Sequence, residues 1–246
     1  MEIKIATQPD DESCGPTCLH AVYQYYGLNI SLNEIIQTID RSPSGGTFCI
    51  SIGKHALQHG FQATIYINSL VIFDPSWFTN GEADNQLLID KLEAQRQAKN
   101  DPYITNATLA IVEYLKLGGK ICAYPLSARL LQKFFLKNIP VISGLSSTNL
   151  YWHTREAFDE KGKSVYDDIR GTPCGHFVIL CGYDSKRRHV IVADPYGGNP
   201  AFRSNYYKVN INRLINAILL GVITFDGNLT VIEPKKSNAV SPEIGF

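Results

Sequence analysis

The spacing of apolar residues changes along the chain, from a helical period in the first sixty residues to short strand-like runs after Pro140. In the first helical pattern, Leu19, Val22 and Tyr26 recur at the i, i+3, i+7 positions of one helix face. Three helices are expected in this part, over residues 14–26, 31–39 and 48–59. A strand-like alternation, "FQATIYI", follows the third of them.

The second half of the chain is dominated by short apolar segments. These are "VISGL", "HFVILCGY", "HVIVAD", "GVITF" and "NLTVI", with one amphipathic helix, "INRLINAILL", among them. The turn "DSKRR" joins the second and third segments, and Asp226–Gly227 predicts a hairpin between the last two. A chain with helices first and mostly antiparallel strands later is expected to fold as an α+β domain.

Residues 68–138 interrupt this order with helical patterns. They are "QLLIDKLEAQRQAK", "TNATLAIVEYLKLGG" and "SARLLQKFFLKN", preceded by the loop "DPSWFTNGEADN". We therefore expect one domain over residues 1–246, with a helical insertion at about 68–138. Trp77 and Phe78 in its loop would serve either as a lid over a cleft or as an anchor that docks the insertion on the core.

Composition narrows the classes of partner. The chain has 246 residues with 23 basic and 23 acidic side chains, and no basic stripe, so nucleic acid is not an expected partner. No apolar run approaches the roughly 20 residues of a membrane span, and the N-terminus has no signal-peptide pattern, so we expect a cytoplasmic protein without membrane contact. The six cysteines form no CxxC pair, and we expect neither a metal site nor another cofactor.

The segment "QPDDESCGPTC" places Cys14 directly before Gly-Pro at the start of the first helix. Proline is suited to the first turn, and the positive field at a helix N-terminus favours the thiolate form of a cysteine. A free cysteine is more commonly a small buried apolar residue. The alternative is a nucleophile, which requires a base elsewhere in the chain.

A base and its orienting group are available on two neighbouring strands. His176 begins "HFVILCGY" and Asp194 ends "HVIVAD". Strands joined by a turn near Ser185 place these two residues opposite each other or one diagonal step apart, within side-chain reach. Taken singly, the histidine would be a strand-edge residue and the aspartate a turn residue. His153, in the long polar segment 146–175, is the rival base.

Gln8 lies six residues before Cys14, on the segment that enters the helix. Acyl chemistry needs hydrogen-bond donors where negative charge develops on the carbonyl oxygen. The Gln8 amide and the Cys14 backbone N–H are candidates for these two donors. The alternative is an exposed glutamine in a loop.

The motifs "Q(x5)CGPTCLHAVYQYYG", "GHFVILCGYD" and "VIVADP" resemble those of the papain-like bacteriocin-processing cysteine peptidases, a family whose transporter-fused members remove leader peptides after a double glycine. The standalone bacterial members are the nearer likeness, and the shared motifs cover residues 1–67 and 139–232. The resemblance implies a papain-like fold in which a helical half and a sheet half meet at a cleft. It implies Cys14 as nucleophile, His176 as base, Asp194 as orienting group and Gln8 as oxyanion-hole donor.

We expect from these features a thiol hydrolase that cleaves a peptide or isopeptide bond through a Cys-His-Asp triad and an acyl-enzyme. Its partner would be a peptide or protein substrate. Two alternatives use the same residues differently. One is an amide or glutamyl acyltransferase, or a deamidase, on the same triad. The other is a catalytically silent peptide-binding module that retains the cleft.

Overall fold

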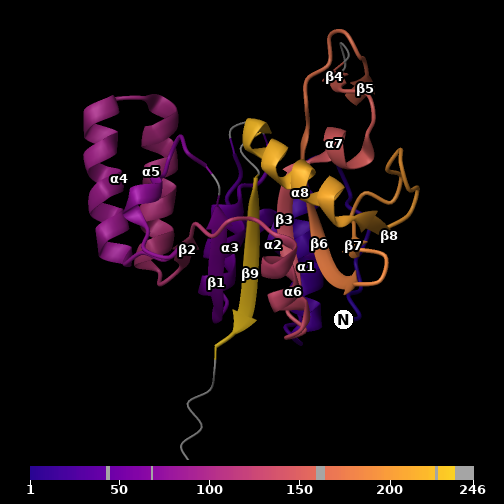
Figure 1. Cartoon of the computed structure of the whole chain (residues 1–246), viewed down its shortest axis with the longest axis horizontal. Coiled ribbons are helices and arrows are strands. Elements are labelled where there is room, and N and C mark those ends of the chain that lie inside the picture. Colours follow the sequence, from indigo (N-terminus) through magenta and orange to yellow (C-terminus); the bar gives the residue numbers. More distant parts are fainter. Residues whose placement is uncertain (43–44, 68, 159–163, 225–226, 236–246) are drawn as a thin grey trace, which may run out of the picture.

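Seven strands form one sheet in the order β2-β1-β9-β3-β6-β7-β8 in the computed structural model of the chain (Figure 1). The structure describes residues 1–42, 45–67, 69–158, 164–224 and 227–235. The strands of this sheet are β1 (Phe61–Ile67), β2 (Lys120–Cys122), β3 (Val141–Ser146), β6 (Gly175–Asp184), β7 (His189–Ala193), β8 (Tyr206–Asn210) and β9 (Asn228–Pro234). The β1–β2 pair is parallel, whereas the other five neighbouring pairs are antiparallel. A separate two-stranded sheet consists of β4 (Glu156–Phe158) and β5 (Ser164–Tyr166).

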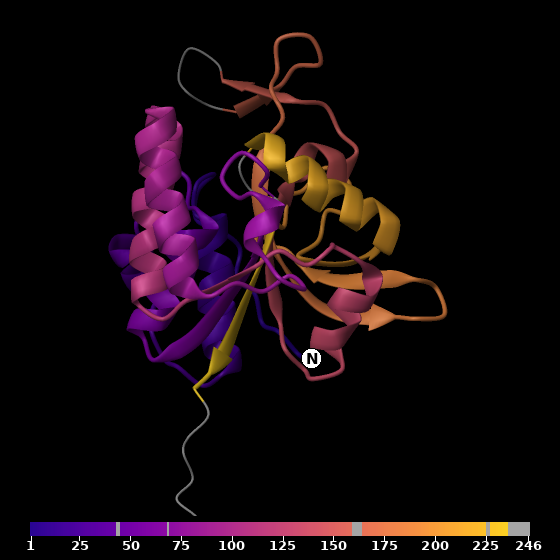
Figure 2. The same cartoon turned by 60° about the vertical axis from the view of Figure 1, so that its left-hand side comes forward.

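Helices cover both faces of the main sheet (Figures 1 and 2). The helices are α1 (Cys14–Tyr25), α2 (Leu32–Thr38), α3 (Cys49–Gln58), α4 (Asn85–Lys99), α5 (Pro102–Lys116), α6 (Ala128–Phe135), α7 (Ser147–Tyr151) and α8 (Ile211–Leu220), with 3₁₀ turns η1 (Pro75–Trp77) and η2 (Gly221–Thr224). The N-terminal helices α1 and α3 contact one face, through β6, β1 and β9. The later helices α6, α7 and α8 lie against β3 and β6 on the other face. None of the helices in the described part of the chain has the length and apolar character needed to cross a membrane.

Strand β6 lies between two hydrophobic cores. Phe177 and Ile179 belong to the core under the N-terminal helices, whereas Val178 and Leu180 belong to the core under α8. A strand buried on both faces needs apolar residues at successive positions rather than at alternate ones. This requirement explains the unbroken apolar run at the start of "HFVILCGY".

The predicted α+β class, with helices first and an antiparallel sheet later, is confirmed. The three N-terminal helices begin and end within about two residues of their expected bounds. The Ser31 hydroxyl accepts a hydrogen bond from the Glu34 backbone N–H at 3.1 Å, as the Ser-x-x-Glu pattern indicates. The expected loop at 146–175 contains α7, β4 and β5 as well.

One strand prediction is wrong. Residues 221–224 form the 3₁₀ turn η2, not a strand paired with β9. Strand β9 pairs with β1 on one side and β3 on the other, so neither of its edges is left for a hairpin partner. Residues 225 and 226, including the aspartate of the expected hairpin turn, lie outside the described residues.

The region predicted as an insertion contributes to the main fold at several points. Helices α4 and α5 lie side by side at one end of the molecule, with α5 against α3 (Figure 1). From the same region, β2 extends the sheet beyond β1, and α6 contacts β6. That residues 68–138 are an insertion within a single domain stays a prediction.

Candidate active site

Cys14 is the first residue of α1 and is half-buried. Its backbone N–H belongs to the first turn, whose N–H groups have no partner within the helix. Gly15 follows, and a Cβ at this position would lie 3.1 Å from the Thr47 Cβ. The glycine therefore lets the first turn of α1 approach the segment that leads into α3. The Cys-Gly-Pro sequence places a thiol at a helix start that is packed closely against its neighbour.

His176 is the second residue of β6, and Asp194 directly follows β7. The β6–β7 register pairs Ile179 with Ala193, so its continuation would place Asp194 opposite Val178. His176 is thus one diagonal step from Asp194. The prediction from turn position, that the two residues are opposite or one diagonal step apart, is confirmed.

The His176 imidazole bridges Asp194 and Cys14. Its Nε2 lies 2.9 Å from Oδ1 of Asp194, and the Cys14 side chain is close enough to the ring to help raise its pKa. Because Nε2 is engaged by the carboxylate, Nδ1 is the ring nitrogen available to the sulfur. The structure therefore brings together three of the predicted site residues, Cys14, His176 and Asp194, from α1, β6 and the end of β7.

The electrostatics of His176 and Asp194 favour an imidazolium beside a carboxylate. Burial on its own lowers the pKa of His176, but the charge and hydrogen bond of Asp194, and then Cys14, outweigh it and raise the pKa well above 6.5. Burial on its own raises the pKa of Asp194, but His176 and the hydrogen bonds from Tyr207 and the Tyr196 N–H hold it below its usual range. A charged imidazole next to a thiol is the arrangement that activates a cysteine nucleophile.

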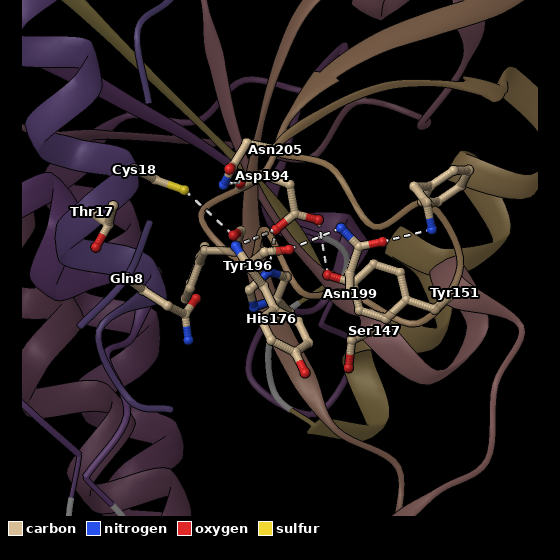
Figure 3. Close-up of polar contacts among 12 residues, drawn as sticks. Gln8, Thr17, Cys18, Ser147, Tyr151, His176, Asp194, Tyr196, Asn199 and Asn205 are labelled. Carbon is tan, nitrogen blue, oxygen red and sulfur yellow. Dashed lines mark hydrogen bonds and ion pairs between the residues drawn. The ribbon is translucent and has the colours of Figure 1, made fainter. Parts of the chain in front are cut away.

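Asp194 has two partners that sequence reasoning missed. The hydroxyls of Tyr151 and Tyr207 both donate to its Oδ2, at 2.8 and 2.7 Å. Figure 3 shows Tyr151 beside the carboxylate, on the side away from Gln8. Tyr151 lies 43 positions before Asp194 and Tyr207 lies 13 positions after it. Nothing in a single sequence marks a tyrosine as the partner of a particular carboxylate.

Gln8 is positioned by its backbone. Its N–H donates to the Pro195 carbonyl at 2.9 Å, directly after Asp194. Its side-chain Nε2 donates to the Asp10 carbonyl at 2.8 Å, while its Oε1 is buried and has no hydrogen-bond partner among the described residues. Figure 3 shows Gln8 between α1 and His176. The structure thus places Gln8 next to the loop that follows Asp194, and its role as an oxyanion donor stays a prediction.

The rival base, His153, is exposed and packs edge-on against Tyr166 at a ring-centroid distance of 4.4 Å. His55 is 2 % exposed. Its Nδ1 lies 2.7 Å from the Tyr23 hydroxyl, and its Nε2 lies 3.1 Å from the Thr38 hydroxyl. Both ring nitrogens of His55 therefore have partners inside the protein.

Part of segment 146–175 borders the site. The side chain of Tyr166 in β5 interacts with that of Tyr196, which follows Asp194 by two residues. The Tyr196 ring in turn lies edge-on to His176, with centroids 6.5 Å apart. The residues before His176 in the sequence therefore fold back next to the imidazole.

Trp77 and Phe78 pack inward from the predicted insertion. Their rings meet Phe73 edge-on, at 6.4 and 5.9 Å between centroids, and both are partly buried against the core under the N-terminal helices. These contacts are those expected of an anchor.

All six cysteines are free thiols. Among the described residues, no group of three or more histidine, cysteine, aspartate or glutamate side chains is arranged to hold a metal ion.

A thiol on a helix N-terminus, facing a histidine that is hydrogen-bonded to a buried aspartate, defines the class of cysteine peptidases with a papain-like arrangement. Two family models match the chain in sequence order. The model described as the Peptidase C39 family matches residues 2–81, and the Peptidase_C39 like family matches residues 111–214. Both models describe C39 peptidases, and together they span most of the chain, which is therefore similar to cysteine peptidases of the C39 type.

Three solved structures are similar over nearly the full length. The peptidase domain of Streptococcus ComA, a bifunctional ABC transporter of a quorum-sensing pathway, is 14% identical, with a TM-score of 0.42, covering 95% of this chain and 100% of that one. A putative C39-like peptidase from Bacillus anthracis is 17% identical, with a TM-score of 0.43 and 96% coverage of both chains. A double glycine motif protease from an AMS/PCAT transporter, in complex with its leader peptide, is 12% identical, with a TM-score of 0.43 and coverages of 95% and 92%. No curated protein matches the sequence.

Proposed function

We propose that this protein is a thiol hydrolase that cleaves a peptide or isopeptide bond through an acyl-enzyme on Cys14. The observation that supports the proposal is the chain of side-chain contacts from Cys14 through His176 to the buried Asp194. The similarity to C39 peptidases points to the reaction class, and these contacts supply residues for it.

In the first half of the reaction, the Cys14 sulfur attacks the carbonyl carbon of the scissile bond. The C–N bond breaks, His176 gives its proton to the leaving amine, and a thioester remains on Cys14. In the second half, a water molecule gives its proton to the now neutral His176 and attacks the thioester. The carboxylic acid product leaves, and the Cys14 thiolate is regenerated beside a protonated His176.

The oxyanion of each tetrahedral intermediate needs two donors. In this proposal they are the Cys14 backbone N–H and the amide hydrogen of Gln8 that is not bonded to the Asp10 carbonyl. The hydrogen bond from the Gln8 N–H to Pro195 connects this donor to the loop that follows Asp194, so the donor and the base are fixed relative to each other.

The double-glycine leader chemistry of the family defines the first substrate to test. A peptide ending in Gly-Gly and carrying a fluorogenic amine as leaving group would be incubated with the wild-type protein and with Cys14→Ala. We expect amine release by the wild type only. A Cys174→Ala variant, which removes the other half-buried thiol, is the matched control and should cleave normally.

Rapid acid quenching would trap the thioester, and mass spectrometry of the Cys14 peptide would identify the acyl group. Faster product formation on addition of a primary amine, with an amide as product, would indicate acyl transfer in place of hydrolysis. Amine release by Cys14→Ala at the wild-type rate would refute the proposal.

A further inference from the structure

The carboxylate of Asp194 is completely removed from solvent and accepts four hydrogen bonds. Its Oδ1 accepts from the His176 ring at 2.9 Å and from the Tyr196 N–H at 2.8 Å. Its Oδ2 accepts from the hydroxyls of Tyr151 and Tyr207. Two carboxylate oxygens offer about four acceptor positions, so every position is occupied by a donor.

The two oxygens have different partners. Oδ1 faces the imidazole and the backbone, whereas Oδ2 is held entirely by phenol groups. These phenols come from separate elements, Tyr151 from the end of α7 and Tyr207 from β8. A donor on each side of Oδ2 stops the carboxylate from rotating, and so keeps Oδ1 directed at His176.

The rings themselves are held by packing. Tyr207 stacks on Phe202, with centroids 3.8 Å apart and planes 6° from parallel, and the Arg213 guanidinium lies 5.9 Å from the Phe202 ring. Tyr151 lies against His176 and Tyr196, at centroid distances of 6.2 and 6.4 Å. Both hydroxyls are therefore preorganised donors, and neither ring can turn away from Asp194 without disturbing a packed neighbour.

A phenol differs from a cation in one respect that matters here. An arginine or lysine at Oδ2 would cancel the negative charge that holds the proton on His176, whereas a neutral hydroxyl stabilises the carboxylate and leaves its charge intact. Burial, and then the negative charge of Asp194, raise the pKa of both Tyr151 and Tyr207 well above the usual range. The two phenols consequently stay neutral donors and do not exchange protons with the site.

We infer that Tyr151 and Tyr207 are positioning residues of the thiol site, which keep the buried Asp194 ionised at acid pH and so keep His176 charged beside Cys14. This inference rests on the proposed function. Its consequence is that the acid limit of Cys14 reactivity depends on two hydroxyl groups that touch neither the thiol nor the substrate carbonyl.

The test is the rate of Cys14 alkylation by iodoacetamide between pH 4 and pH 8, which needs no substrate. Without one hydroxyl, a buried carboxylate with three donors protonates at a higher pH. Tyr151→Phe and Tyr207→Phe should each lower the rate about tenfold near pH 5, with little change near pH 8. In the double variant, the loss of alkylation rate at low pH should begin at a still higher pH. Asp194→Asn should be alkylated slowly at every pH.

Tyr114→Phe is the matched control. Tyr114 is also fully buried, and its hydroxyl donates to the carbonyls of Ala63 and Lys120, far from Asp194 in the sheet. This variant loses a buried tyrosine hydroxyl without touching the site, so its pH profile should match the wild type. Circular dichroism at each pH checks that the variants are folded. If the double variant does not fold, the single variants alone test the positioning role.

The outcomes separate the two proposals. If iodoacetamide does not prefer Cys14 in the wild type, the thiol site is refuted and the inference falls with it. If Cys14 is preferred but the tyrosine variants keep the wild-type profile, or lose the same fraction of rate at every pH, only the positioning role is refuted.

Discussion

The Nε2 atom of His176 lies 2.9 Å from Oδ1 of Asp194, although the two residues are separated by 18 positions and by a hairpin turn. The contact is a diagonal one across β6 and β7, and it places both groups at the ends of these strands farthest from the turn. Since the carboxylate engages Nε2, Nδ1 is the ring nitrogen left for the thiol. The hairpin therefore fixes both the position of the base and the nitrogen that it presents.

Asp194→Asn should lower turnover by about 10³-fold or more, because the amide cannot hold the proton on His176. An amide has only one acceptor oxygen for the four donors that surround this carboxylate, so the variant should also unfold at a lower temperature. Turnover of a cleavable peptide and thermal unfolding would be measured together. Wild-type turnover in a folded Asp194→Asn protein would exclude Asp194 from the mechanism.

Limiting iodoacetamide at about pH 6 should alkylate Cys14 before the other five cysteines. Four of those five are buried. Cys174 is half-buried, but burial and then the negative charge of Glu156 raise its pKa to about 12. Peptide mass mapping after partial labelling measures the order. Preferential labelling of Cys174 would show that exposure, and not the site, determines reactivity.

Gln8→Ala should lower turnover by about 10²–10³-fold, since one of two oxyanion donors is lost. The side chain has a single hydrogen bond, to the Asp10 carbonyl, so thermal unfolding should change little. Gln8→Glu keeps the size of the side chain without the N–H donor and should lose activity to a similar extent. Full activity in both variants would remove Gln8 from the site.

Acid should destabilise the fold partly through His55. Burial, and then His59 stacked on it at 4.1 Å, lower the pKa of His55 to about 4, whereas an unfolded histidine has a pKa of about 6.5. A depressed folded-state pKa means that the unfolded chain binds the proton more readily. The stabilisation is therefore complete above about pH 6.5 and is lost as the pH falls toward 4.

The corresponding measurement is the free energy of unfolding in urea at pH 7 and at pH 5. His55→Gln should show a smaller decrease between the two pH values than the wild type, by up to about 1.4 kcal/mol for each pH unit in the window. The matched control is His189→Gln, because the His189 ring bonds to the nearby Arg187 carbonyl at the surface and not to a core side chain among the described residues. An equal pH dependence in the wild type and His55→Gln would contradict this prediction.

Trp77→Ala should loosen the predicted insertion while leaving the thiol site intact. Loss of its partly buried contact with Phe73 should cost about 1–2 kcal/mol and speed proteolysis within residues 69–82. The rate of Cys14 alkylation should be unchanged if Trp77 is an anchor. A changed rate would instead support a lid.

Much of the fold was predictable from the period of apolar residues. The N-terminal helices, β1, β3, the β6–β7 hairpin and α8 follow local patterns, and their bounds agree with the structure to within a few residues. In the main sheet, the short strands β2 and β8 were missed. Strand β2 has three residues, too few to establish a period, and β8 alternates exposed and buried residues within a stretch rich in polar side chains.

The sequence alone determined which residues could supply the chemistry of the site. Cys14 is marked by its place before Gly-Pro, and His176 and Asp194 by their places on two strands joined by a short turn, because helix starts and hairpin registers are local properties of the chain. Only the tertiary structure decided what surrounds them. Tyr151 and Tyr207 reach Asp194 from α7 and β8, and Gln8 is held by the loop after Asp194, through contacts between residues distant in sequence. Such contacts depend on how distant elements pack around a buried charge, and a particular contact of this kind leaves no periodic pattern in the sequence.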